Sequence, residues 1–342
     1  MQVSILIPTR NRCEALRKTL ESLAAIAPDA GNHEVIVVDN GSTDDTRAVA
    51  EHAAHALPAL RYVFEPMPGL LSGRHRAAKE AKGDVCAYLD DDVQVGPEWL
   101  TGMTDAFRDP GVAMVGGPST PLFRSEPPDW LAEFYAEDEQ GRYCGWLSLF
   151  DGGDRIKDID PCLVWGLNYA IRRPVLFDVG GFHPDNIPKA LQRYQGDGET
   201  GLSLSVKRAG LKAQYHPKVA VQHVTPASRL TAEYFAERGF YQGVCNSYTQ
   251  LREDGGRAAA PPSPSWLGRL RQFARDNIHG EQSPAAAMRR RTAAAYAAGH
   301  AFHQQEVRRD PTLLEWVLRP DYWDYQLPSG WEQYLGAIGT PR

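Results

Sequence analysis

The sequence predicts an α/β protein in which helices flank a mostly parallel sheet, followed by a helical C-terminal extension. Two observations support this fold class. Apolar, strand-like runs alternate with helical patterns over residues 3–89, and the pattern becomes helical beyond Pro226. We expect the sheet domain to occupy residues 1–229 and the helical region residues 230–342, with a linker rich in Gly, Ala and Pro at about 254–265.

Strands and helices alternate regularly in the first part of the chain. The strands are expected at residues 3–7, 34–38, 60–64 and 85–89, and the helices at 13–27, from Ser42 or Thr43 onward, and at 72–81. This alternation produces parallel strands joined by right-handed crossovers, so helices should cover both faces of the sheet. Weaker patterns predict strands at 112–115, 164–171 and 219–224, and the long segment 109–160 is otherwise expected to be irregular.

The composition narrows the class of protein. Of the 342 residues, 42% are hydrophobic and 23% are charged, and the net charge of -6 argues against a general nucleic-acid binder. Five dispersed cysteines without a C-x-x-C pair suit reduced thiols. The first residues lack a basic leader with an apolar core, and no apolar stretch reaches membrane-spanning length. We therefore expect a cytoplasmic protein without a transmembrane segment.

Polar clusters directly follow three of the expected strands. Thr9 and Arg10 follow the first strand, Asp39 follows the second, and three carboxylates at 90–92 follow the fourth. In open α/β sheets, ligands bind outside the carboxyl ends of the parallel strands. These clusters should therefore meet along one edge of the sheet and form one crevice.

The carboxylate triplet Asp90-Asp91-Asp92 is the main candidate for cation binding at this edge. Three adjacent negative charges at the end of a buried strand repel one another, so they need a compensating cation or water. A hard divalent ion with oxygen ligands would suit them and would keep open positions for substrate phosphates. The alternative is that Asp92 begins a turn and caps the following helix.

Two arginines open the helix expected at 72–81. Gly69 and Gly73 would allow close approach to the backbone, and Arg74 and Arg76 lie near a helix N-terminus that already favours anions. Phosphate binding is one interpretation, because arginine contacts phosphate through two nitrogens. A solvated basic helix start is the other.

Further candidates lie late in the chain. Asp197 and Glu199 stand in a glycine-rich turn before an amphipathic helix, where they could cap the helix or supply a general base. His223 ends the strand expected at 219–224, as the acidic clusters end theirs. A lone histidine is usually structural, but this position at a strand end also admits a role in the crevice.

The C-terminal region offers surfaces for packing or association. Apolar residues at i+4 steps form a stripe over 236–248, and an amphipathic helix with Trp266 and Phe273 is expected at 266–275. That helix should pack on the core, with peripheral membrane contact as the alternative. Aromatic residues over 316–331 should pack on the body or on a second subunit, which would make a homodimer.

With these residues placed, the chain resembles family 2 glycosyltransferases, the inverting enzymes with the GT-A nucleotide-sugar-binding fold. Six segments carry the resemblance in the right order: 4–12, 37–44, 69–84, the D-x-D signature at 90–92, 165–173 and 196–202. The resemblance covers about residues 3–229. The chain departs from the family at Gly73 and His75, where the family has Ala and Asn.

The resemblance implies roles for individual residues. Donor contacts are implied for Pro8, Thr9, Arg10, Asp39, Gly69, Arg74, Asp90, Asp91, Gly166 and Asn168. Asp92, with His223 as a further ligand, would bind Mn²⁺ or Mg²⁺. Aligning Thr200 and Leu202 with the family's segment puts Glu199 at the position of the catalytic base, and Asp197 remains the alternative.

The implied reaction moves a sugar from a nucleotide diphosphate-sugar, with a UDP-sugar favoured, to a hydroxyl of a glycan, a lipid-linked or a small-molecule acceptor. The metal and Arg74 would neutralise charge on the departing diphosphate. One alternative is a sugar-1-phosphate nucleotidyltransferase, although such enzymes usually have a glycine-rich loop after the first strand and residues 8–13 contain no glycine. A non-catalytic nucleotide-sugar-binding protein is the other.

Overall fold

A computed structural model describes residues 1–26, 31–257 and 283–327. The chain forms two compact units. Unit 1 contains Met1–Glu126, Tyr135–Pro226 and the described part of Arg319–Arg342, and unit 2 contains Pro127–Phe134 and Ala227–Leu318. The expectation was a single division at residue 229. In the structure, Pro127–Phe134 groups with the later helices, and the described residues from Arg319 onward group with the sheet domain. Most of the expected linker, the expected helix at 266–275 and Trp331 lie outside the described residues.

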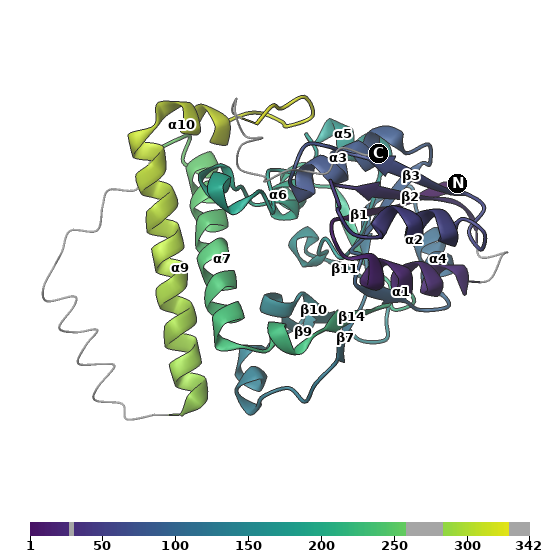
Figure 1. Cartoon of the computed structure of the whole chain (residues 1–342), viewed down its shortest axis with the longest axis horizontal. Coiled ribbons are helices and arrows are strands. Elements are labelled where there is room, and N and C mark those ends of the chain that lie inside the picture. The colour runs from purple at the N-terminus through teal and green to yellow at the C-terminus, as the bar shows by residue number, and fades with distance from the viewer. Residues whose placement is uncertain (27–30, 258–282, 328–342) are drawn as a thin grey trace, which may run out of the picture. The chain divides into compact units, whose positions relative to one another are not determined.

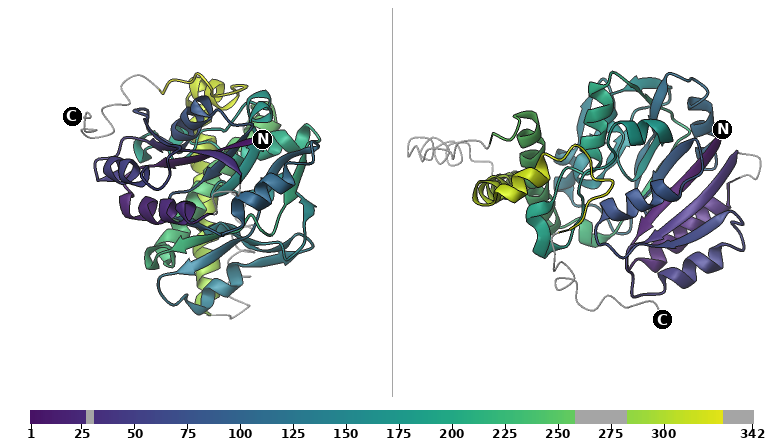
Figure 2. Two further views of the ribbon diagram at one scale, coloured as in Figure 1. Left: turned by 90° about the vertical axis from the view of Figure 1, so that its right-hand side faces the viewer. Right: turned by 90° about the horizontal axis from the view of Figure 1, so that it is seen from above.

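An eight-stranded sheet forms the centre of unit 1. Its strands, in spatial order, are β11 (Lys157–Ile159), β13 (Lys212–Tyr215), β6 (Val112–Gly116), β12 (Asn168–Arg172), β4 (Val85–Leu89), β1 (Gln2–Thr9), β2 (Asn32–Asp39) and β3 (Leu60–Phe64). The first four strands of the chain pair in parallel, as predicted, and lie side by side in Figure 2. β12 enters between β4 and β6 in the antiparallel direction.

Helices cover both faces of this sheet, which explains the continuous apolar runs of its strands. On one face, α1 (Cys13–Ala24), α2 (Thr46–Ala53) and α4 (Trp99–Ala106) pack on alternate residues of β1 and β2, among them Val3, Ile5, Val35 and Val37. α3 (Leu70–Glu80) and α5 (Arg173–Asp178) lie on the opposite face (Figure 1).

A second sheet of six short strands was not anticipated. It consists of β5 (Val93–Val95), β14 (Val221–Thr225), β7 (Ser119–Phe123), β10 (Leu149–Asp151), β9 (Gly141–Cys144) and β8 (Ala136–Asp138). Four of these strands fall in the segment expected to be irregular, because strands of three to five residues are too short to show alternation. α6 (Glu199–Arg208) follows the glycine-rich turn as predicted.

Unit 2 is built on two long helices, α7 (Ala232–Glu253) and α9 (Pro284–Arg309), followed by α10 (Pro311–Val317). α7 and α9 lie side by side (Figure 1) and run parallel, since Gly239 faces Thr292 and Ser247 bonds His303 further along both helices. A Cβ at Gly239 would lie 2.7 Å from the Thr292 carbonyl oxygen, so glycine permits the close approach.

Among the residues that the structure describes, no helix combines the length and the apolar character needed to cross a membrane. Within the predicted stripe of α7, Val244 and Tyr248 are fully buried.

Candidate functional site

The carboxyl ends of β1, β2 and β4 meet at one edge of unit 1. Thr9 is the register partner of Asp39 on β2, and Leu6 pairs with Tyr88 on β4, which places the residues after β4 beside Thr9. The Thr9 hydroxyl donates to Asp91 Oδ2 at 2.7 Å. The three polar clusters therefore share one edge, as the sequence predicted.

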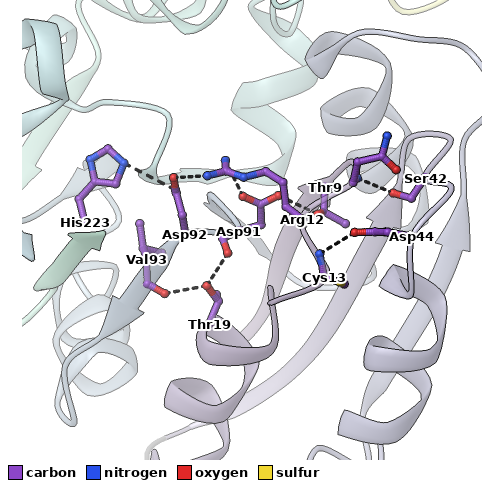
Figure 3. Close-up of polar contacts among 11 residues, drawn as sticks. Thr9, Arg12, Cys13, Thr19, Ser42, Asp44, Asp91, Asp92, Val93 and His223 are labelled. Carbon is purple, nitrogen blue, oxygen red and sulfur yellow. Dashed lines mark hydrogen bonds and ion pairs between the residues drawn. The ribbon is translucent and has the colours of Figure 1, made fainter. Parts of the chain in front are cut away.

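Arg12 holds two members of the carboxylate triplet together. Its Nη1 lies 2.9 Å from Asp91 Oδ1, and its Nη2 donates to Asp92 Oδ2 at 2.7 Å (Figure 3). The Thr19 hydroxyl lies within hydrogen-bond distance of the carbonyl oxygens of Asp91 and Val93, at 2.9 and 2.7 Å, which steadies the backbone of the triplet. Arg12 was absent from the predicted site, although it stands in the same turn as Thr9 and Arg10.

The triplet is electrostatically crowded. Burial raises the pKa of Asp91 to about 7, against the stabilising charge of Arg12. Burial and the neighbouring Asp92 also raise the pKa of Asp90, while Arg74 and His223 oppose the rise. Additional positive charge would therefore stabilise the ionised carboxylates, and a divalent cation could supply it.

Asp92 and His223 fit a metal site. His223 Nε2 lies 3.6 Å from Asp92 Oδ1, and both side chains are buried. His223 Nδ1 lies 2.9 Å from the Leu147 carbonyl oxygen, which can only accept, so Nδ1 carries the proton and the Nε2 lone pair is on the side of Asp92. In the described part of the chain, no three His, Cys, Asp or Glu side chains are arranged to hold a metal ion. Asp92 and His223 would therefore supply two side-chain ligands to a divalent ion at this edge.

Asp39 is buried at the end of β2 and held from two sides. Its Oδ1 accepts from the Ser42 backbone N–H and its Oδ2 from the Tyr62 hydroxyl, both at 2.8 Å. Burial and this bond to Asp39 raise the pKa of Tyr62, so the phenol stays protonated as a donor. Tyr62 was missed from the sequence, because it belongs to β3 and meets Asp39 only through strand pairing.

Gly69 and Pro8 shape the backbone around α3. Gly69 adopts φ +115°, a region that favours glycine, and its N–H donates to Asn40 Oδ1 at 2.9 Å. A Cβ at Gly73 would lie 3.0 Å from Pro8 Cβ, so glycine at this position lets α3 approach β1 closely. Arg10 is half-buried directly after β1.

Arg74 is the buried cation of the site, with only 2% of its side chain exposed. Its Nη1 donates to Glu199 Oε2 at 3.0 Å and lies 3.7 Å from Asp185 Oδ2, and its guanidinium stands 5.0 Å from the centre of the Phe182 ring. Burial disfavours its charge, but Glu199 and Asp185 outweigh burial and raise the pKa of Arg74. Within the described residues, its buried Nε has no hydrogen-bond partner, which calls for an explanation.

Gly166 lies against Arg74, whereas Asn168 has a different set of partners. A Cβ at Gly166 would collide with Arg74 Nη2 and lie 3.2 Å from Glu199 Cδ, so only glycine leaves room for the Arg74–Glu199 pair. The Asn168 amide accepts from Trp99 Nε1 at 2.9 Å and donates to the Val219 carbonyl oxygen at 2.8 Å. The side chain of Asn168 thus ties β12 to α4 and to the segment before β14.

The two carboxylates of the glycine-rich turn point to different partners. Asp197 is 2% exposed and lies 2.6 Å from His183 Nδ1, and a Cβ at Gly201 would collide with that ring. Glu199, the first residue of α6, is 29% exposed and pairs with Arg74. The more accessible carboxylate therefore faces the arginine. Sequence reasoning missed His183 because it stands in an irregular segment and meets Asp197 only through tertiary packing.

Comparisons with known proteins place this chain in a family. Residues 4–178 match the family model described as glycosyl transferase family 2. A glucosyl-dolichyl phosphate glucuronosyltransferase of Haloferax volcanii is 24% identical over 260 residues, which cover 73% of this chain and 78% of that protein.

Two solved structures show a similar fold. A mannosyltransferase from Pyrobaculum calidifontis, in complex with GDP-Man and Mn²⁺, superposes with a TM-score of 0.53 at 19% identity, covering 95% of this chain and 88% of that one. GalNAc-T7 with UDP, GalNAc and Mn²⁺ gives a TM-score of 0.52 at 16% identity, covering 80% and 54%. The predicted GT-A architecture with a helical C-terminal part is confirmed.

Proposed function

Because this chain belongs to glycosyltransferase family 2, we propose that it transfers a sugar from a nucleotide diphosphate-sugar to an acceptor hydroxyl, with inversion and with the aid of Mn²⁺ or Mg²⁺. The observation that carries the proposal is the shared sheet edge, where Asp92 with His223, Asp39 and the Arg74–Glu199 pair belong to the same unit. No observation favours a nucleotidyltransferase.

Each part of the donor would meet a different residue. Asp39, held by Ser42 and Tyr62, presents a fixed acceptor to the N–H of a nucleobase. Arg74 is permanently charged and offers its unpartnered Nε to a phosphate oxygen. Thr9 and Arg12 hold Asp91 and Asp92 in place, so the carboxylate that binds a metal is positioned before the donor arrives.

A divalent ion at Asp92 and His223 would stabilise the negative charge that develops on the departing diphosphate. Glu199 accepts the proton of the acceptor hydroxyl as that oxygen attacks the sugar. Arg74 holds the Glu199 side chain in place through a hydrogen bond of 3.0 Å. Asp197 is buried against His183 and supports the turn that carries Glu199.

The test is a donor screen with the purified full chain. Thermal unfolding is measured with a set of nucleotide diphosphate-sugars, UDP-sugars first, each with Mn²⁺ and with EDTA. Binding donors are then incubated with candidate acceptors, and products are identified by mass spectrometry. A metal-dependent shift followed by transfer or slow donor hydrolysis supports the proposal. Binding without any turnover would instead indicate a non-catalytic nucleotide-sugar-binding protein.

Gly166→Ala should lower the turnover number by about a hundredfold, because the new methyl group would displace Arg74 from Glu199, and misplacements near 1 Å cost that much. Gly145→Ala is the matched control, since a Cβ there meets nothing within 4 Å. Steady-state kinetics gives the turnover numbers of both variants, and thermal unfolding shows whether both are folded. Full activity in a folded Gly166→Ala protein would show that the Arg74–Glu199 geometry is not needed.

A further inference from the structure

The described C-terminal end of the chain returns to unit 1 and packs on the helix that carries Arg74. We name residues 319–327 the C-terminal strap. Three α3 residues spaced i, i+3 and i+7, and therefore on one helix face, contact it. The contacts join Ser72 Oγ to the Tyr325 hydroxyl, His75 Nδ1 to the Tyr322 carbonyl oxygen at 3.2 Å, and Lys79 Nζ to the Trp323 carbonyl oxygen at 2.6 Å.

His75 is the central member of this face and uses both ring nitrogens. Nδ1 donates to the Tyr322 carbonyl oxygen, and Nε2 accepts from the Phe182 backbone N–H at 3.0 Å. Burial lowers the pKa of His75 to about 3, so the ring is neutral at physiological pH and keeps this donor and acceptor assignment. Trp323 stacks on the ring, with centroids 4.0 Å apart and an interplanar angle of 20°.

The loop that contains Gly181 packs closely against both His75 and Trp323. Gly181 adopts φ +73°, and a Cβ there would lie 2.7 Å both from His75 Nε2 and from the Trp323 ring. The next residue, Phe182, places its ring 5.0 Å from the guanidinium carbon of Arg74. One imidazole thus connects the C-terminal strap to the aromatic ring that supports Arg74.

We propose that His75 is a positioning residue for glycosyl transfer: the C-terminal strap holds the imidazole, which fixes Phe182 beneath Arg74 and so aligns the guanidinium with Glu199. The inference rests on the proposed function, because it takes Glu199, held by Arg74, as the base of the transfer reaction. It also gives a physical reason for histidine where the family pattern has asparagine. An asparagine amide can replace Nδ1 but has no atom at the place of Nε2, so it cannot make both contacts.

Two substitutions separate the two contacts. His75→Gln keeps an acceptor oxygen near the place of Nε2 and should retain most of the turnover number. His75→Asn keeps a donor for Tyr322 but loses the anchor of Phe182, so we expect the turnover number to fall about tenfold with the donor KM unchanged. Trp323→Ala, which removes the stack, should have an effect in the same direction. Asp324→Asn, at an exposed strap residue paired with Lys79, is the matched control and should have none.

A double-mutant cycle distinguishes positioning from general stability. If His75 acts through Arg74, adding His75→Asn or Trp323→Ala to Arg74→Lys should cost little further activity, although each variant alone is impaired. Thermal unfolding of every variant excludes loss of fold, and Trp323→Phe provides a milder change to the strap. Wild-type turnover in His75→Asn and Trp323→Ala, or effects that add fully to Arg74→Lys, would overturn the inference alone. Absence of transfer by the wild-type protein with every donor would overturn the proposed function and the inference with it.

Discussion

Glu199→Gln is expected to lower the rate of sugar transfer by at least about a hundredfold while leaving donor affinity unchanged. The amide keeps the shape of the carboxylate and can still accept the hydrogen bond from Arg74 Nη1, which is 3.0 Å long in the wild-type protein. It cannot take a proton from the acceptor hydroxyl. Glu199 is 29% exposed at the start of α6, so a hydroxyl can reach it. Single-turnover kinetics and calorimetric donor binding would measure the two quantities separately.

Asp197→Asn is the matched comparison, because it removes the other carboxylate of the same turn. Asp197 is buried and hydrogen-bonded to His183 at 2.6 Å, so we expect a milder loss of transfer that accompanies a loss of stability. The reverse ranking, with both proteins folded and binding donor normally, would move the base to Asp197.

Asp92→Asn should abolish the dependence of donor binding on a divalent ion and lower turnover strongly. The substitution removes one negative charge from a cluster of buried carboxylates that favours a cation, and it weakens the contact with His223, 3.6 Å away. Arg12 still pairs with Asp91 at 2.9 Å, so the turn should keep its structure. Calorimetric titration of donor with Mn²⁺ and with EDTA provides the measurement.

Asp109→Asn controls for the charge change in that experiment. Asp109 is exposed and pairs with Lys212 at 3.4 Å, outside the described site. Its donor binding should respond to EDTA as the wild-type protein does. Donor affinity that is the same with Mn²⁺ and with EDTA in the wild-type protein would contradict a metal held by Asp92.

The local sequence was sufficient to predict that the polar clusters meet at one edge of the sheet. Alternating strands and helices determine parallel pairing, and parallel pairing brings Thr9, Asp39 and the triplet to the same side of the sheet. The position of Asp197 and Glu199 in a turn before a helix also followed from the sequence, because it depends on only a few residues. These features are short-range or follow from a general rule of chain handedness, so no contact between distant segments had to be known.

Tertiary structure alone decided how the predicted residues are held. Tyr62 reaches Asp39 across two strands, Arg12 bridges two carboxylates some 80 residues away in sequence, and His183 pairs with Asp197. The antiparallel entry of β12 and the return of residues 319–327 to α3 likewise join segments that no local pattern connects. The physical reason is that hydropathy periodicity reports whether a side chain is buried, whereas its partner in the buried site is set by how distant elements pack.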